Sequence, residues 1–123
     1  MARWLDPRSG EHVRAEHWTS AADQGAAVAR DLRGEGVPLD EVPYVWSDQY
    51  DWRLQVLGRP LPDDEVVLRR TGAEGTRLLA LYTREGRLSG AVGIGAARAV
   101  MWMRPLLAAG ASVDEALSLA VAA

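Results

Sequence analysis

The sequence predicts an α+β fold, with a small antiparallel sheet of about four strands and helices packed on one face. Three observations predict it. Four segments between residues 51 and 94 have the composition of strands, and short turns separate them. Two helical patterns follow the last of these segments. One further helix precedes them, after a polar N-terminal stretch without a regular period.

The first helix is predicted over residues 16–33 by apolar residues spaced three and four apart, namely Trp18, Ala21, Gly25, Val28 and Leu32. Thr19 or Ser20 is the expected N-cap, and Gly34, Gly36 and Pro38 supply the stop. Because Ala21 and Gly25 are small, a packing partner would approach this part of the stripe closely. A sheet or a bound cofactor would suit it.

The strongest boundary lies at residues 34–43, where glycine, proline and acidic residues cluster. Strands are predicted at residues 51–58, 65–71, 77–83 and 87–94. In the first of them Trp52, Leu54 and Val56 point one way while Arg53 and Gln55 point the other. The strands form a meander, with hairpin turns at TGAEG and REGR.

Two helices complete the chain. The first is predicted over residues 96–109, with Gly110 as its stop. Its internal Pro105 predicts a kink or a late start. Ser112 caps the last helix, whose first turn carries Asp114 and Glu115, as the helix dipole favours.

Composition limits the function. The 123 residues carry a net charge of −3 and no cysteine, which gives no reason to expect a nucleic acid or anionic membrane as partner and excludes disulfides and cysteine-ligated metals. No signal peptide or membrane-spanning run is recognisable, so a cytoplasmic location is expected. The first 16 residues are expected to lie across another part of a larger fold.

Most candidate chemistry is weak. His12 and His17 are five apart, so they cannot share a helix face as a metal-binding pair does. Two histidines support no catalytic triad. The GAVGIG run of residues 90–95 lacks the GxGxxG spacing and the strand–turn–helix context of a dinucleotide site. No catalytic or metal-binding residue is therefore predicted.

Two stretches remain as candidates. The start of the first helix could stabilise an anion through its backbone N–H groups, although every helix has such an end. The second stretch, YVWSDQYDW at residues 44–52, is unusually aromatic: residues 42–58 hold four of the eight aromatic residues. An exposed Trp46 would mark a binding surface, whereas a buried one would be core, and Trp52 in the alternating strand is the better core candidate.

These motifs resemble the C-terminal third of the FAD-dependent NAD(P)H:ferredoxin reductases, which serve rubredoxins, putidaredoxin-like ferredoxins and dioxygenase ferredoxins. The similarity covers essentially the whole chain. It runs from EHWTSAADQG through VPYVWSDQYDWRLQVLG, DEVVLRR and REGRL to RAVMWMRPLLAAGASVDEAL.

The resemblance implies that residues 1–36 are the loop and final helix of a FAD-binding domain, and that residues 40–123 are the reductase C-terminal domain. It further implies that Glu16, His17 and Trp18 lie against FAD with Trp46, the helix dipole favouring negative charge on the flavin. Trp46 would also lie near the docking surface for a [2Fe–2S] ferredoxin. The partner-binding residues would be Tyr44, Trp46, Ser47, Asp48 and Gln49, the last three orienting a loop.

The chain departs from the family pattern in lacking both GxGxxG fingerprints and the flavin-contacting aspartate, so FAD binding by this chain alone is expected to be weak or nil. Tyr44-Val45 also replaces a more frequent pair of larger aromatics. The leading hypothesis is the C-terminal portion of an electron-transferring flavoprotein, with a separate chain that carries the FAD and NAD(P)H domains as a candidate partner. The alternative is a freestanding interaction module that binds a ferredoxin or self-associates through residues 21–28. A chance match with an unrelated small α+β binding protein is the third.

Overall fold

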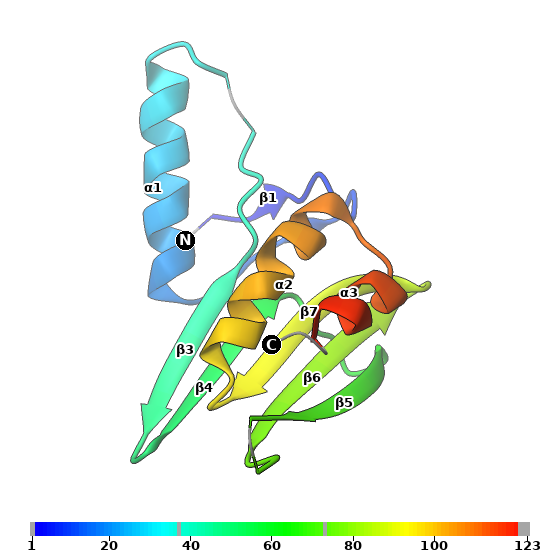
Figure 1. Cartoon of the computed structure of the whole chain (residues 1–123). Coiled ribbons are helices and arrows are strands. Elements are labelled where there is room, and N and C mark those ends of the chain that lie inside the picture. The colour runs from blue at the N-terminus through cyan, green and yellow to red at the C-terminus, as the bar shows by residue number, and fades with distance from the viewer. Residues whose placement is uncertain (1, 37, 73, 121–123) are drawn as a thin grey trace. The chain divides into compact units, whose positions relative to one another are not determined.

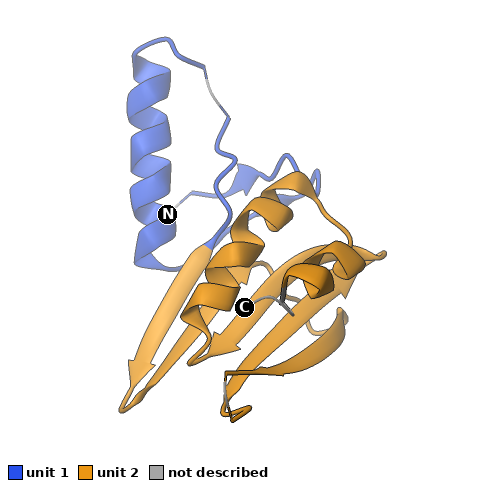
Figure 2. Ribbon diagram, viewed as in Figure 1, with its two compact units in different colours: residues 1–43 blue, residues 44–123 orange. Residues whose placement is uncertain are grey.

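The structure is a computed structural model that describes residues 2–36, 38–72 and 74–120. The chain divides into two compact units, residues 1–43 and residues 44–123 (Figure 2). Among the helices that the structure describes, none has both the length and the apolar character that crossing a lipid bilayer requires.

The first unit begins with a two-stranded hairpin rather than the irregular loop that was expected. Strand β1 (Trp4–Leu5) pairs with β2 (His12–Val13) in antiparallel register. Helix α1 (Trp18–Leu32) follows. Two-residue strands have too little alternation to be recognised in a sequence.

The N-cap of α1 is His17, and the prediction of Thr19 or Ser20 was wrong. The backbone of His17 is extended, and its ring Nδ1 accepts a hydrogen bond from the Ser20 backbone N–H at 3.3 Å. The ring thus performs the task that a serine or aspartate side chain usually performs. Ser20 lies inside the helix and is its buried residue.

The second unit holds a five-stranded antiparallel sheet with the strand order β3-β4-β7-β6-β5. The strands are β3 (Tyr44–Gln49), β4 (Trp52–Gly58), β5 (Glu65–Thr71), β6 (Arg77–Arg84) and β7 (Arg87–Ile94). The α+β class and four of the strands agree with the sequence prediction. The predicted meander was wrong, because β4 pairs with β7 and not with β5, which lies at the other edge of the sheet. The additional strand is β3, in the segment expected to be a loop.

Helices α2 (Ala97–Ala109) and α3 (Val113–Ala120) lie on the same face of the sheet (Figure 1). Helix α2 packs on β4 and β7, and α3 packs on β6 and β7. Helix α2 begins at Ala97 and runs on through Pro105, so the late start considered from the sequence does not occur.

The core of this unit fills the space between the sheet and α2. Its largest fully buried side chains are Leu57, Leu79, Leu81, Val100 and Met103. A close approach of the helix requires a glycine in the sheet, because a Cβ atom on Gly93 would lie 2.3 Å from Cγ2 of Val100. Gly93 of the GAVGIG run therefore has a packing role.

The connection from α2 to α3 is joined to the start of β7 by backbone hydrogen bonds. Gly110 ends α2 in the left-handed conformation, at φ 63°. The Leu88 N–H then donates to the Ala111 carbonyl at 2.9 Å, and Arg87 and Ser112 form an isolated antiparallel bridge.

Ser112 caps helix α3, as the sequence predicts, and Glu115 completes a capping box that was not predicted. The Ser112 N–H and hydroxyl donate to Oε2 of Glu115 at 2.8 and 2.9 Å, and the Glu115 N–H donates to the Ser112 hydroxyl at 3.3 Å. The two bonds from Ser112 hold the pKa of the Glu115 carboxyl below its usual value.

A buried carboxylate fixes the turn between β4 and β5. The Asp64 side chain is 1% exposed and accepts bonds from Nε and Nη2 of Arg84, from the Leu61 N–H and from the Ser89 hydroxyl. Burial alone would raise the pKa of Asp64, but these four bonds outweigh it and lower the pKa.

Candidate functional site

The β3–β4 hairpin holds two aromatic rings of the candidate stretch against each other. Tyr44 and Trp46 are two residues apart on β3, so they lie on the same face of the sheet. Their ring centroids are 5.5 Å apart with planes inclined by 24°, a stacked arrangement. Both residues are half-buried, so each ring keeps some exposed surface.

Two residues that the sequence did not single out hold Tyr44 in place. The side-chain amide of Gln55 donates to the Tyr44 hydroxyl at 2.7 Å, and the guanidinium of Arg104 lies over the Tyr44 ring at 5.7 Å. Gln55 is 2% exposed, and its Oε1 accepts no hydrogen bond from the described residues. A glutamine alternating with leucine and valine could have signalled a buried polar contact.

The remaining predicted partner-binding residues lie in strand β3 rather than in a loop. Asp48 is exposed and makes a paired contact with Arg53 opposite, at 2.6 and 3.1 Å. The bond from Arg53 holds the pKa of the Asp48 carboxyl below its usual value. Ser47 and Gln49 lie on the other face, where the Gln49 amide donates to the Ser47 hydroxyl at 2.7 Å.

Trp52 does not belong to the core, contrary to the expectation from its alternating strand. It is 51% exposed, on the sheet face opposite to α2. The helices cover only one face, so the apolar side of β4 that includes Trp52 and Leu54 borders a shallow apolar groove instead. The groove is lined by Gln49, Trp52, Leu54, Thr76, Leu78 and Ile94.

At the tip of this hairpin, Tyr50 is fully exposed and has a left-handed backbone, with φ 54°. A bulky residue rarely adopts that conformation, so the tip is strained. It lies in the stretch that the sequence marked as a possible interaction surface.

In the other unit, the predicted flavin-side residues surround the start of α1. Glu16 pairs with Arg14, His17 caps the helix, and Trp18 is its first residue. The Trp18 side chain is 67% exposed, and α1 has no acidic residue in its first turn. A positive helix end without an acidic residue in its first turn, next to an exposed indole, fits a planar, electron-rich group.

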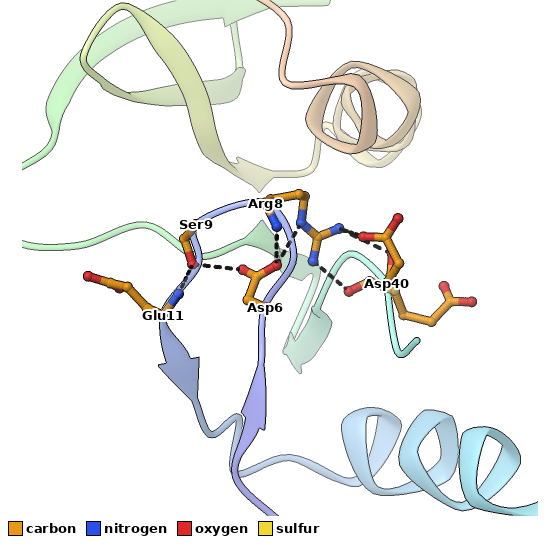
Figure 3. Close-up of polar contacts among 6 residues, drawn as sticks. Asp6, Arg8, Ser9, Glu11 and Asp40 are labelled. Carbon is orange, nitrogen blue, oxygen red and sulfur yellow. Dashed lines mark hydrogen bonds and ion pairs between the residues drawn. The ribbon is translucent and has the colours of Figure 1, made fainter. Parts of the chain in front are cut away.

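The loop between β1 and β2 is tied to the segment that follows α1 (Figure 3). Arg8 donates to the backbone carbonyls of Asp40 and Glu41, at 3.2 and 3.0 Å, and pairs with the carboxylates of Asp6 and Asp40. Ser9 also donates to Asp6. This cluster links the β1–β2 loop to the segment that follows α1. Within the described residues, no group of three or more histidines and carboxylates could hold a metal ion.

Comparison with known families gives one match over most of the chain. Residues 44–121 match the model of the family described as "Reductase C-terminal". This stretch corresponds to the second unit, which contains the Tyr44–Trp46 stack and both helices that cover the sheet.

Individual relatives match more of the chain. The reductase component of an anthranilate 1,2-dioxygenase system, a ferredoxin–NAD(+) reductase from Burkholderia cepacia, is 37% identical over 110 residues, which are 89% of this chain and 27% of the relative. A ferredoxin reductase subunit of a 5,5'-dehydrodivanillate O-demethylase from a Sphingobium species is 34% identical over 107 residues, or 86% of this chain and 26% of the relative. The chain thus spans about a quarter of the length of these relatives.

Solved structures agree. The ferredoxin reductase for the CYP199A2 system from Rhodopseudomonas palustris superposes with a TM-score of 0.77 at 32% identity, over 88% of this chain and 26% of that one. Putidaredoxin reductase, solved as a covalent complex with putidaredoxin, shares the fold with a TM-score of 0.76 at 23% identity, over 88% of this chain and 26% of that one. With its five-stranded sheet, its two covering helices and the family match from residue 44 onward, the chain belongs to the reductase C-terminal domain family.

Proposed function

We propose that this chain supplies the C-terminal part of a flavoprotein that passes electrons from NAD(P)H through FAD to a [2Fe–2S] ferredoxin. In this proposal residues 1–36 belong to the FAD-binding part and residues 40–123 form the C-terminal domain. The partner is the ferredoxin, and the FAD and NAD(P)H domains can be carried by a separate chain.

The observation that carries the proposal is the Tyr44–Trp46 stack. Both rings are rigid and half-exposed, and Gln55 and Arg104 hold Tyr44 from two sides. Rigid aromatic rings are well suited to a recognition surface because little conformational freedom is lost on binding. We assign Tyr44, Trp46, Ser47, Asp48 and Gln49 to partner binding and Trp46 also to the flavin side.

In the first unit, the proposed FAD-bordering residues are Glu16, His17 and Trp18. Bound FAD would link a two-electron hydride donor to a one-electron carrier. The residues of this chain fit that group, since Trp18 offers an exposed indole face and the positive end of α1 favours negative charge on a ring placed against it. His17 holds the helix start in shape by capping it.

The test is a chimeric reductase in which this chain replaces the matching 110 residues of the Burkholderia relative. We expect the chimera to bind FAD and to reduce a ferredoxin with NADH as donor. Trp46→Ala should slow ferredoxin reduction about tenfold or more, the cost of losing an aromatic hot spot. It should slow reduction of ferricyanide, a small acceptor that needs no docking surface, far less.

Leu68→Ala is the control, because Leu68 is also an exposed apolar side chain but lies on β5, at the other edge of the sheet. A folded chimera that binds FAD but responds equally to both substitutions would contradict the assignment of Trp46. A folded chimera that binds no FAD would contradict the flavin-side role of residues 16–18.

The apolar stripe of α1 favours a second function, that of an interaction module that binds a ferredoxin or self-associates. Val28 is 58% exposed and Leu32 84% exposed, so the stripe is open to a partner. Sedimentation velocity tests it. Self-association that Val28→Glu abolishes would support the interaction module. A monomer at all concentrations would exclude a module that acts by self-association.

A further inference from the structure

We propose that the outer side of helix α2 binds carboxylates of an acidic redox protein, with Arg98 and Arg104 as its two charged anchors. We call this surface the α2 docking face and define it as Arg98, Met101, Trp102 and Arg104. The inference rests on the proposed function, because it extends the ferredoxin-binding surface from Tyr44 and Trp46 onto α2.

The spacing of these residues on α2 turns them away from the core. Ala99, Val100, Met103 and Leu107 are buried against the sheet. Arg98, Met101 and Trp102 are three and four residues apart and share the outer side. Met101 is 36% exposed and Arg98 is exposed, and Arg104 continues the surface on the flank that carries Tyr44.

Both arginines rest on aromatic rings. The guanidinium of Arg98 lies 4.7 Å from the ring centroid of Trp102, and that of Arg104 lies 5.7 Å from the centroid of Tyr44. A guanidinium that stacks on a ring uses its flat face. Its N–H donors lie in the plane of the group, so its edge can still donate two parallel hydrogen bonds to a carboxylate.

Charge decides which partner fits. Helix α2 has two arginines and no carboxylate, in a chain whose net charge is −3. Among the residues that the structure describes, neither Arg98 nor Arg104 forms an ion pair. Arg53, on the same side of the sheet, is already neutralised by Asp48. The uncompensated positive charge therefore complements an acidic protein surface.

The composition of the face also fits a protein partner. The face consists of arginine, methionine and tryptophan, three of the residue types that are enriched where proteins bind one another. Stacking restrains both long arginine side chains before binding, which lowers the conformational entropy lost in the complex. Tyr44 connects the two surfaces, since it touches Arg104 of the α2 docking face on one side and Trp46 on the other.

The experiment titrates the full 123-residue chain, labelled with ¹⁵N, with an acidic [2Fe–2S] ferredoxin at low salt. Each tryptophan gives its own indole N–H signal. The paramagnetic cluster of the ferredoxin broadens the signals that lie near it, so each tryptophan reports contact separately. We expect the Trp102 and Trp46 signals to broaden and that of Trp52 to stay sharp. Arg98→Glu with Arg104→Glu should weaken binding about tenfold or more, as expected when two charged anchors are reversed.

The control is Arg69→Glu with Arg70→Glu on strand β5, which changes the net charge by the same amount away from α2. It should change Kd by less than about threefold, the effect of long-range charge alone. Arg98→Lys with Arg104→Lys keeps the charge, so this variant should bind more tightly than the double reversal to glutamate. Circular dichroism should show the same fold for every variant.

The outcomes separate the two proposals. Broadening of Trp46 without Trp102, or equal weakening by both double reversals, would overturn the α2 docking face and leave the proposed function standing. A ferredoxin that binds without affecting either signal, or that does not bind at all, would overturn both. A dimer of the chain that is lost in Arg98→Glu/Arg104→Glu, with ferredoxin binding unchanged, would assign the face to self-association and overturn the inference.

Discussion

The two compact units place their apolar side chains in opposite ways. In the second unit Leu57, Leu79 and Leu81 are completely buried under the helices. In the first, Val28 and Leu32 of α1 are mostly exposed, and the buried apolar side chains described there are Val13 and Val42. The second unit therefore has its own hydrophobic core, whereas α1 presents an apolar stripe suited to a further contact.

The largest difference should appear when one leucine of each unit is shortened. Leu81→Ala should lower the free energy of unfolding of the second unit by about 3 kcal/mol, because Leu81 is 0% exposed and the substitution leaves a cavity. Leu32→Ala, at an 84% exposed position, should change stability by less than about 0.5 kcal/mol. Urea unfolding followed by circular dichroism measures both. Similar losses would show that α1 has a buried partner within this chain.

A matched pair of glycines sharpens the same comparison. Gly93→Ala should destabilise the second unit by about 2 kcal/mol, because the new Cβ would clash with Val100. Gly25→Ala, with open space around it inside α1, should instead raise the helix stability by about 0.5–1 kcal/mol. Thermal unfolding distinguishes the two signs, and a stable Gly93→Ala protein would mean that α2 can shift away from the sheet.

The polar clusters of the two units should differ in the same direction. Asp64→Asn should cost the second unit about 1.5 kcal/mol at pH 7, because the buried carboxylate accepts four bonds from three partners. Arg8→Ala should loosen only residues 6–11 and 40–41, because the Arg8 side chain is more exposed, at 22%. Hydrogen exchange of the two regions separates these effects, and Asp63→Asn, at an exposed neighbour, is the control.

The pH dependence of the Asp64 effect has a definite sign. Its pKa in the folded protein lies below its ordinary value of 3.8. The carboxylate therefore stabilises the fold fully above that value, and this stabilisation is lost as the pH falls through the lower folded-state pKa. The gap between the wild type and Asp64→Asn should be constant from pH 7 to 5 and shrink below about pH 4. A gap independent of pH would contradict the role of the charge.

The smallest effect concerns the tip of the β3–β4 hairpin. Tyr50→Asn should stabilise the second unit by up to about 1 kcal/mol, because asparagine tolerates the left-handed backbone better than tyrosine. Tyr50→Phe, which keeps the strained bulky ring, should leave stability unchanged. A destabilised Tyr50→Asn protein would show that the exposed ring makes a contact worth more than the strain.

Much of this architecture could be predicted from the sequence where the pattern is local. Strands β5 (Glu65–Thr71) and β7 (Arg87–Ile94) agree with the prediction residue for residue, since turns and alternation mark their limits. Strand β3 was missed because its run of aromatic and polar residues alternates poorly, and its pairing with β4 is a tertiary property. Which face of the sheet the helices cover could not be predicted from the sequence either. Gln55 is buried and Trp52 exposed because α2 lies on the less apolar side of β4.

The candidate site shows the same limit. Tyr44 and Trp46 could be selected from composition and from the family resemblance, and their stacking follows from alternation along a strand. Arg104 is 60 residues away in the sequence, and only the packing of α2 brings it over Tyr44. The role of His17 as N-cap was hidden because histidine seldom occupies that position.

The hydrogen-bonded connection between α2 and α3 has a consequence for how the second unit opens. A helix of eight residues is too short to persist alone in water. The bond from Leu88 to Ala111 and the bridge between Arg87 and Ser112 attach the beginning of α3 to a central strand. The amide protons of α3 should therefore exchange with solvent together with those of β7 rather than in a separate early step, so that α3 belongs to the same cooperative unit as the core.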